Sequence, residues 1–192
     1  MGGSLGSYAV LGSPDIILLT LTEFAEQARR ACRASRVALL ADADHGYGNA
    51  LNVMRAVEEL EHAGVAALTI EDTLLPRAHG AGAKPQFIAI AEGVGKMKAA
   101  LAARRDPALV IVGRTSAHLT NGVDDAIARL RAYEAAGVDA LMVPGIRTRD
   151  ELDRISAGVT LPLIAGGAAP DLADPAYLAS KRVRVFSPGH QA

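Results

Sequence analysis

Three acidic residues follow two apolar runs of the chain at short spacing. Asp42 and Asp44 come after residues 37–41, and Glu71 comes after residues 66–70. Residues two apart on a strand face the same side, so Asp42 and Asp44 are expected to point together, with Glu71 entering from the neighbouring strand end. Carboxylates without an adjacent Lys or Arg repel one another unless a cation lies among them. Hard oxygen ligands in small number suit magnesium, which keeps several waters and leaves room for a substrate.

A second interpretation of Asp42 and Asp44 is that they cap the next helix, since Asp is a favoured N-cap. Against it, the Gly46-Tyr47-Gly48 insert delays the helix to about Asn49. Acids at the ends of parallel strands are also typical of functional sites. A calcium loop of the EF-hand type is excluded, because the required Gly and Glu offsets are missing.

Two further residues suit carboxylate binding. Arg114 directly follows the apolar run 109–112, and its guanidinium can grip a substrate carboxylate at two points. The alternative for Arg114 is a plain salt bridge to one of the acids. His190 follows the last apolar run and is a candidate acid/base or carboxyl ligand. The alternative for His190 is a frayed residue near the end of the sequence.

Other chemistries find less support in the sequence. No strand-end lysine is available for a Schiff base, since the lysines lie in a loop, on a helix and near a helix end, at Lys84, Lys96, Lys98 and Lys181. No Gly-rich phosphate loop follows a predicted strand. The connection 74–87 is long and irregular, with Pro76, Gly80, Gly82 and Pro85, which predicts an active-site lid.

Short apolar runs alternate with longer amphipathic stretches, which predicts repeated βα units and a parallel sheet. The predicted strands are 37–41, 66–70, 109–112, 139–143, 161–164 and 183–186. The predicted helices are 22–35, 50–63, 90–104, 123–136 and 148–157. The sequence of residues 63–68 recurs at 136–141 with Asp139 in place of Ala66, and each segment has a Gly suited to the end of a helix.

Composition sets the broad class. The chain has 192 residues, a net charge of −1, 50% apolar residues and one Cys, which indicates one folded α/β domain over residues 1–192. Without a basic block, neither nucleic acid nor an anionic membrane is an expected partner. The start lacks a secretory signal, so we expect a cytoplasmic protein. An eight-fold barrel takes about 250 residues, and this chain is short for it.

The motifs at residues 41–49, 68–72 and 113–115 together resemble the isocitrate lyase and phosphoenolpyruvate mutase superfamily. Residues 44–55 and 71–76 are most similar to its oxaloacetate decarboxylase branch. The resemblance covers essentially the whole chain. It implies an α/β fold of the (β/α)8 TIM-barrel type and an assembly of like subunits, a tetramer in the family.

The resemblance also implies the site. It places Mg²⁺, or alternatively Mn²⁺, at Asp44, with Asp42, Glu71 and Asp15 holding the waters of the metal. It implies substrate binding and catalysis by Arg114 and His190, with Tyr47 in the pocket. The backbone around Gly3, Ser4 and Leu5 is expected to meet a substrate carboxylate.

The sequence departs from the family pattern in several places. The first strand and helix of the barrel and its final helices, which family members exchange between subunits, have no counterpart, so the barrel is expected to be truncated. The catalytic lid Cys of the family's lyases is missing, since residues 77–80 read Arg-Ala-His-Gly. Residues 165–168 read Ala-Gly-Gly-Ala where the decarboxylase branch has a Tyr.

The leading hypothesis is a magnesium-dependent lyase of 2-oxo acids that decarboxylates oxaloacetate to pyruvate through an enolate stabilised by the cation. The acid that protonates the enolate would be Tyr47, His190 or a water. One alternative changes the substrate to a substituted malate, methylisocitrate or phosphonopyruvate. A third hypothesis is an inactive, truncated family member whose barrel is completed by a partner chain.

Overall fold

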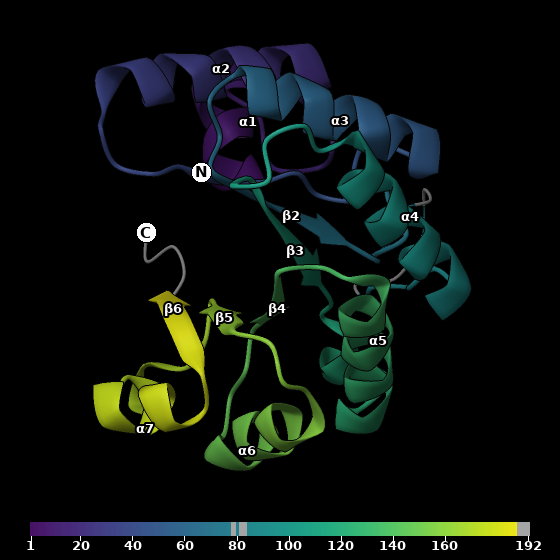
Figure 1. The fold of residues 1–192 in the computed structure, drawn as a ribbon, viewed down its shortest axis with the longest axis vertical. Helices are drawn as coiled ribbons and strands as arrows, with labels where there is room; N and C mark the ends of the chain where they lie inside the picture. The colour runs from purple at the N-terminus through teal and green to yellow at the C-terminus, as the bar shows by residue number, and fades with distance from the viewer. Residues whose placement is uncertain (78–79, 81–83, 188–192) are drawn as a thin grey trace. The chain divides into compact units, whose positions relative to one another are not determined.

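The computed structural model describes residues 1–77, 80 and 84–187. Two N-terminal helices precede a regular alternation of strands and helices (Figure 1). The strands are β1 (Leu40–Asp42), β2 (Ala67–Glu71), β3 (Val110–Arg114), β4 (Ala140–Pro144), β5 (Leu163–Gly166) and β6 (Val183–Ser187). The α-helices are α1 (Gly3–Leu11), α2 (Leu21–Ala34), α3 (Ala50–His62), α4 (Ile90–Ala103), α5 (Val123–Ala136), α6 (Arg149–Gly158) and α7 (Pro175–Ser180).

The strands pair in chain order, from β1 to β6, in one sheet. Strands β1 and β2 are parallel, and the Val110 N–H donates to the Ala66 carbonyl at 3.0 Å where β3 begins. The pairs β3–β4, β4–β5 and β5–β6 are also parallel. This arrangement confirms the predicted α/β class with a parallel sheet, because helical crossovers bring each strand back in the same direction.

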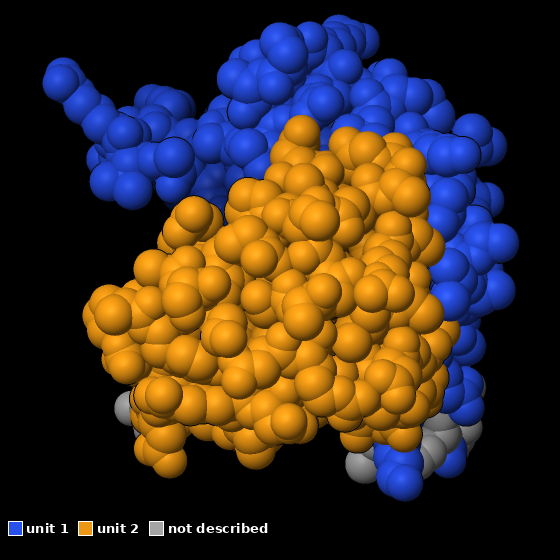
Figure 2. Space-filling view, turned by 60° about the horizontal axis from the view of Figure 1, so that its bottom comes forward, with its two compact units in different colours: residues 1–111 blue, residues 112–192 orange. Residues whose placement is uncertain are grey.

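The chain divides into two compact units, residues 1–111 and 112–192, with the boundary inside β3 (Figure 2). In the first unit, α3 packs against α2 and α4, and fully buried side chains such as Leu60, Leu68 and Met97 form its core. In the second unit, α5 packs against α6, with Tyr133 and Leu141 fully buried. The prediction of a single domain over residues 1–192 stays a prediction.

The predicted strand boundaries are shifted. Val37 is 79% exposed, and β1 begins only at Leu40, where the ladder to Ala67 of β2 starts. Apolar character alone therefore placed this strand too early, because a strand also needs a hydrogen-bonded neighbour. The other strands also begin or end within a few residues of the predicted bounds, whereas α5 has the predicted bounds, 123–136.

Two helices were not predicted. Helix α1 is apolar on nearly all sides, so its sequence has no helical period, and α7 spans only 6 residues. Although α1 is apolar, its 9 residues are too few to cross a membrane. None of the helices in the described part of the chain is long and apolar enough to do so.

Candidate functional site

The turn after β1 has an unusual backbone. The φ angles are positive at Asp44 (49°), Gly46 (75°) and Tyr47 (63°). A Cβ at Gly46 would lie 2.4 Å from Cγ2 of Val53, so this position accepts only glycine without rearrangement. The turn delays the next helix to Ala50, as predicted, and its N-cap is Asn49, whose side chain accepts from the Leu51 and Asn52 N–H groups.

This geometry settles one alternative. Because Asn49 caps α3, the interpretation of Asp42 and Asp44 as helix caps is wrong. The two carboxylates are half-buried at the end of β1 instead.

The end of β2 is tied to this turn. The carboxylate of Asp42 accepts hydrogen bonds from the Thr69 hydroxyl at 3.0 Å and from the Asp44 N–H at 3.2 Å. The Glu71 N–H donates to the Asp44 carbonyl at 2.8 Å. The structure thus places Asp42, Asp44 and Glu71 at adjoining strand ends, as the strand spacing predicts.

Asp15 and Tyr47 complete this cluster. A Cβ added at Gly3 would lie 3.2 Å from Oδ1 of Asp44 and 3.4 Å from Oδ2 of Asp15, so both carboxylates approach the start of α1. The pKa of Tyr47 is raised, first by burial and then by the negative charges of Asp44, Asp42 and Asp15. Tyr47 therefore keeps its proton at neutral pH in the presence of these acids.

The donor set of this cluster fits magnesium. Its groups are carboxylates and a phenol, which are hard oxygen ligands. Within the described residues, no group of three His, Cys, Asp or Glu side chains lies close enough together to hold a metal ion by itself. An ion bound here would keep several of its waters, as Mg²⁺ commonly does.

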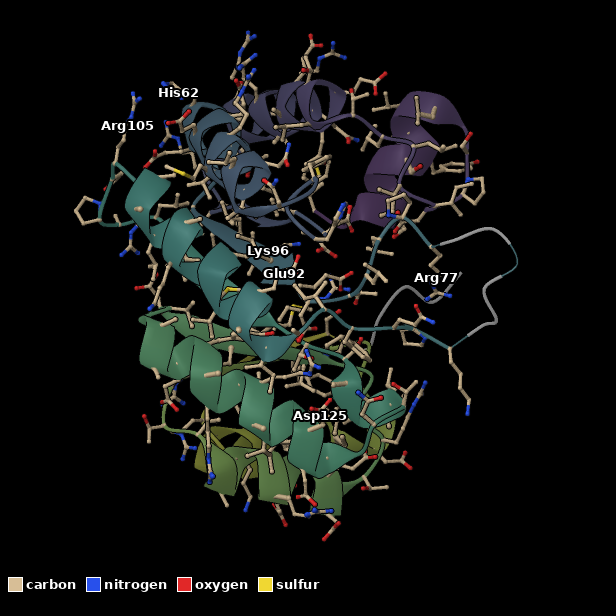
Figure 3. All side chains as sticks on the ribbon, turned by 90° about the vertical axis from the view of Figure 1, so that its right-hand side faces the viewer. His62, Arg77, Glu92, Lys96, Arg105 and Asp125 are labelled. Atoms are coloured by element: carbon tan, nitrogen blue, oxygen red, sulfur yellow. The ribbon has the colours of Figure 1, made fainter. Side chains whose placement is uncertain are left out.

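Lys96 is a residue of this region that the sequence reasoning missed. It lies on α4, is 3% exposed, and its Nζ donates to the His45 carbonyl at 3.0 Å. Figure 3 shows Lys96 and Glu92 close together along α4. A signal was present in the sequence, because Lys96 shares the helical face of the buried Gly93, Met97 and Ala100.

His45 is also buried, at 6% exposure. Burial, and secondly the charge of Lys96, lower the pKa of His45 to about 4. The imidazole is therefore neutral at pH 7, and its Nδ1 has no hydrogen-bond partner within the described residues.

The remaining predicted residues are divided between the first unit, the second unit and the part of the chain outside the described residues. Arg114 ends β3 and is half-buried, and the Thr115 N–H next to it donates to the Met142 carbonyl at 3.1 Å. His190 lies outside the described residues. Gly3 and Ser4 begin α1, followed by Leu5, which is 54% exposed.

The predicted lid is closed at its base. The Leu74 N–H donates to the Gln86 carbonyl at 2.8 Å, and the Ile88 N–H donates to the Asp72 carbonyl at 3.0 Å. Thr73 and Phe87 form an antiparallel bridge between these bonds. Residues 78–79 and 81–83 of the predicted lid lie outside the described residues.

A hollow of about 220 Å³ lies elsewhere in the first unit, lined by Glu61, His62, Arg105 and Asp106. Figure 3 labels His62 and Arg105 there. The Glu61 carboxylate accepts from the Asp106 N–H at 2.6 Å and from the Arg105 N–H at 3.1 Å. These bonds hold the connection from α4 to β3, so we assign the hollow a structural role.

Comparison with known proteins identifies the family. Residues 2–192 match the phosphoenolpyruvate phosphomutase family. The chain belongs to this family. The chain is 62% identical over 189 residues to an oxaloacetate decarboxylase of Bradyrhizobium sp. (strain BTAi1 / ATCC BAA-1182). The aligned region covers 98% of this chain and 65% of the relative. This similarity indicates the oxaloacetate decarboxylase branch of the family.

Two further members of the family extend this result. An oxaloacetate decarboxylase of Paraburkholderia xenovorans (strain LB400) is 58% identical over 191 residues, covering 100% of the chain and 64% of the relative. The solved structure of a phosphonopyruvate hydrolase, in complex with oxalate and Mg²⁺, has a TM-score of 0.85 at 31% identity and covers 98% of this chain and 67% of that one. The chain thus spans about 65% of the length of its curated relatives.

Proposed function

We propose that the protein is a magnesium-dependent lyase that decarboxylates oxaloacetate to pyruvate. The observation that carries the proposal is the cluster of Asp15, Asp42 and Asp44 around Tyr47 at the ends of α1 and β1. Its carboxylate oxygens are of the kind that Mg²⁺ prefers as ligands, which supports the proposal. The similarity to oxaloacetate decarboxylases supports this choice of substrate.

The ion would be held by Asp44, with Asp42, Glu71 and Asp15 binding its waters. When bound, it supplies positive charge that stabilises the enolate left after CO₂ departs. Mg²⁺ is the favoured ion, and Mn²⁺ accepts the same oxygen ligands.

The chain's own residues orient the substrate and move the proton. Arg114 would bind a carboxylate of the 2-oxo acid through its two-point guanidinium, and the backbone of residues 3–5 would meet the other. Tyr47, whose hydroxyl is protonated at neutral pH, would donate a hydrogen bond to the reacting oxygen or a proton to the enolate carbon. His190 and a water remain the other proposed sources of this proton.

Phosphonopyruvate is the second candidate substrate, favoured by the likeness to the phosphonopyruvate hydrolase structure. We also propose that the six parallel strands belong to a (β/α)8 barrel and that the protein assembles from like subunits. Carbon–carbon cleavage of a substituted malate is less favoured, because the family's lid Cys is absent from residues 77–80.

The direct test is Asp44→Ala, with Glu26→Ala as the control. Glu26 is an exposed acid of α2, and its carboxylate accepts a hydrogen bond from the Arg30 guanidinium at 2.8 Å. We expect Asp44→Ala to abolish turnover that depends on added Mg²⁺, and Glu26→Ala to retain it. Each variant is assayed with oxaloacetate, 2-methylisocitrate and phosphonopyruvate, before and after removal of metal by a chelator. Full activity of Asp44→Ala would overturn the assignment.

A further inference from the structure

The turn that carries Asp44 and Tyr47 is built from unfavourable backbone angles. Asp44 and Tyr47 both have left-handed φ angles, 49° and 63°, which non-glycine residues adopt only when surrounding contacts hold them. Successive carbonyls of the turn are accordingly bonded. The Ala43 carbonyl accepts from the Gly46 N–H at 2.8 Å, and the Asp44 carbonyl accepts from the Glu71 N–H at 2.8 Å.

The next carbonyl, that of His45, is bonded by a side chain from another element. The Nζ of Lys96 donates to it at 3.0 Å across 51 positions of sequence, and the bond is buried. A buried ammonium loses its hydration, so it persists only with bonds and opposite charges around it. Burial lowers the pKa of Lys96, and the negative charges of Glu92, Asp72 and Glu71 oppose that shift by favouring the charged form.

We propose that Lys96 is a positioning residue for the candidate metal site. Its ammonium fixes the His45 carbonyl, and thereby the orientation of Asp44 and Tyr47 on either side. The same charge offsets the negative charges of Glu71 and Asp72, which follow each other at the end of β2. Helix α4 thus contributes to the site through the buried bond of Lys96 to the His45 carbonyl.

This inference rests on the proposed function only for its catalytic consequence, because the anchoring of the turn is a property of the metal-free chain. The main variant is Lys96→Met, which keeps the length and apolar stem of the side chain and removes the charged donor. Lys96→Gln is the second variant, to be used if Lys96→Met does not fold. Lys96→Arg keeps the charge and a donor.

Two residues next to Lys96 provide matched controls. Lys98→Met removes the same charge from an exposed position of α4. Met97→Ala removes a fully buried side chain from the same helix without touching the His45 carbonyl, so it reproduces a loss of core packing alone.

The first measurement is hydrogen exchange of the backbone amides of residues 44–48 in metal-free full-length chain. We expect faster exchange in Lys96→Met, little change in Lys98→Met, and partial recovery in Lys96→Arg. Met97→Ala is expected to lower the midpoint of thermal unfolding. In this variant the backbone amides of residues 44–48 should still be protected from exchange when compared with the amides of the rest of the first unit. Equal exchange of these amides in Lys96→Met and the wild-type protein would overturn the proposal.

The second measurement is the binding of Mn²⁺, monitored by the loss of the electron paramagnetic resonance signal of the free ion. It is combined with kcat and KM for oxaloacetate. We expect a dissociation constant for Mn²⁺ about tenfold or more higher in Lys96→Met, and a fall in kcat of about 10–100-fold with a smaller change in KM. A Mn²⁺ affinity in Lys96→Met as high as in Met97→Ala contradicts the proposal. If the wild-type chain neither binds Mn²⁺ nor decarboxylates oxaloacetate, while Lys96→Met still loosens residues 44–48, the proposed function fails and the positioning role stands.

Discussion

The Thr69 hydroxyl on β2 donates a hydrogen bond to Oδ1 of Asp42 on β1 at 3.0 Å, which fixes a carboxylate of the candidate site from the neighbouring strand. Thr69 is fully buried, and the Asp42 carboxylate is half-buried. We expect Thr69→Val to lower the free energy of unfolding by about 1–2 kcal/mol, because a buried hydrogen bond to a charged acceptor is lost. It should also weaken Mg²⁺ binding.

Denaturant unfolding and metal titration check this prediction. Thr69→Ser keeps the hydroxyl and should retain most of the metal affinity. Thr69→Val with the unfolding midpoint and metal affinity of the wild-type protein would show that this bond does not hold Asp42.

Gly3 leaves room for the carboxylates of the site. A Cβ there would approach Oδ1 and Oδ2 of Asp44 to 3.2 and 3.3 Å, so the carboxylate must shift by a few tenths of an ångström. We expect Gly3→Ala to weaken Mn²⁺ binding about tenfold, as changes around metal ligands commonly do. The readout is metal affinity rather than stability, because Ala also favours the start of α1.

Gly95→Ala is the matched control. Gly95 lies within α4, and a Cβ at that position meets nothing within 4 Å. The substitution should raise the free energy of unfolding by about 0.5–1 kcal/mol through helix propensity alone and leave metal binding unchanged. Equal metal affinities for Gly3→Ala and Gly95→Ala would contradict the close approach of Asp44 to Gly3.

His45 makes the metal-free protein less stable in acid. Its pKa falls from 6.5 to about 4 on folding, first through burial and then through Lys96. Between these two values the unfolded chain binds a proton that the folded chain does not, so stability falls as pH drops from about 6.5 to 4. After allowance for solvent screening, we expect a contribution of about 1–2 kcal/mol.

The measurement is the free energy of unfolding from pH 7.5 to 4 in the presence of a chelator. His45→Gln should flatten the curve by that amount, while the residual slope reports other groups, including His118, whose pKa burial also lowers. Parallel curves for the two proteins would refute the assigned protonation state of His45.

Arg114 is proposed to bind a substrate carboxylate at two points. Lysine offers a single point charge, so Arg114→Lys should lose about 1.5–3 kcal/mol of binding, or about 10–100-fold in kcat/KM for oxaloacetate. Arg184→Lys on β6, an exposed position, is the control and should not change kcat/KM. Steady-state kinetics of both variants test this prediction. An unchanged kcat/KM for Arg114→Lys would show that Arg114 does not bind the substrate carboxylate at two points.

The sequence predicted the alternation of elements well, because burial on both faces of a parallel strand leaves a continuous apolar run. It placed α5 at 123–136 and the start of α3 at Ala50, where a capping residue marks the boundary. It misplaced the start of β1, because a strand begins where it hydrogen-bonds to a neighbouring strand, and the sequence of a strand does not identify that neighbour. It missed α1 because a helix apolar on nearly all sides shows no period.

By itself, the sequence determined that Asp42, Asp44 and Glu71 lie at the ends of the first two strands, because they follow apolar runs and local backbone geometry sends such residues to a common edge. Only the tertiary structure decided what surrounds them. Asp15 reaches Gly3 and Asp44 through the fold, and Lys96 meets the His45 carbonyl from 51 positions away. The reason is physical: a buried charge is stable only beside partners that packing brings together, and no local pattern names those partners.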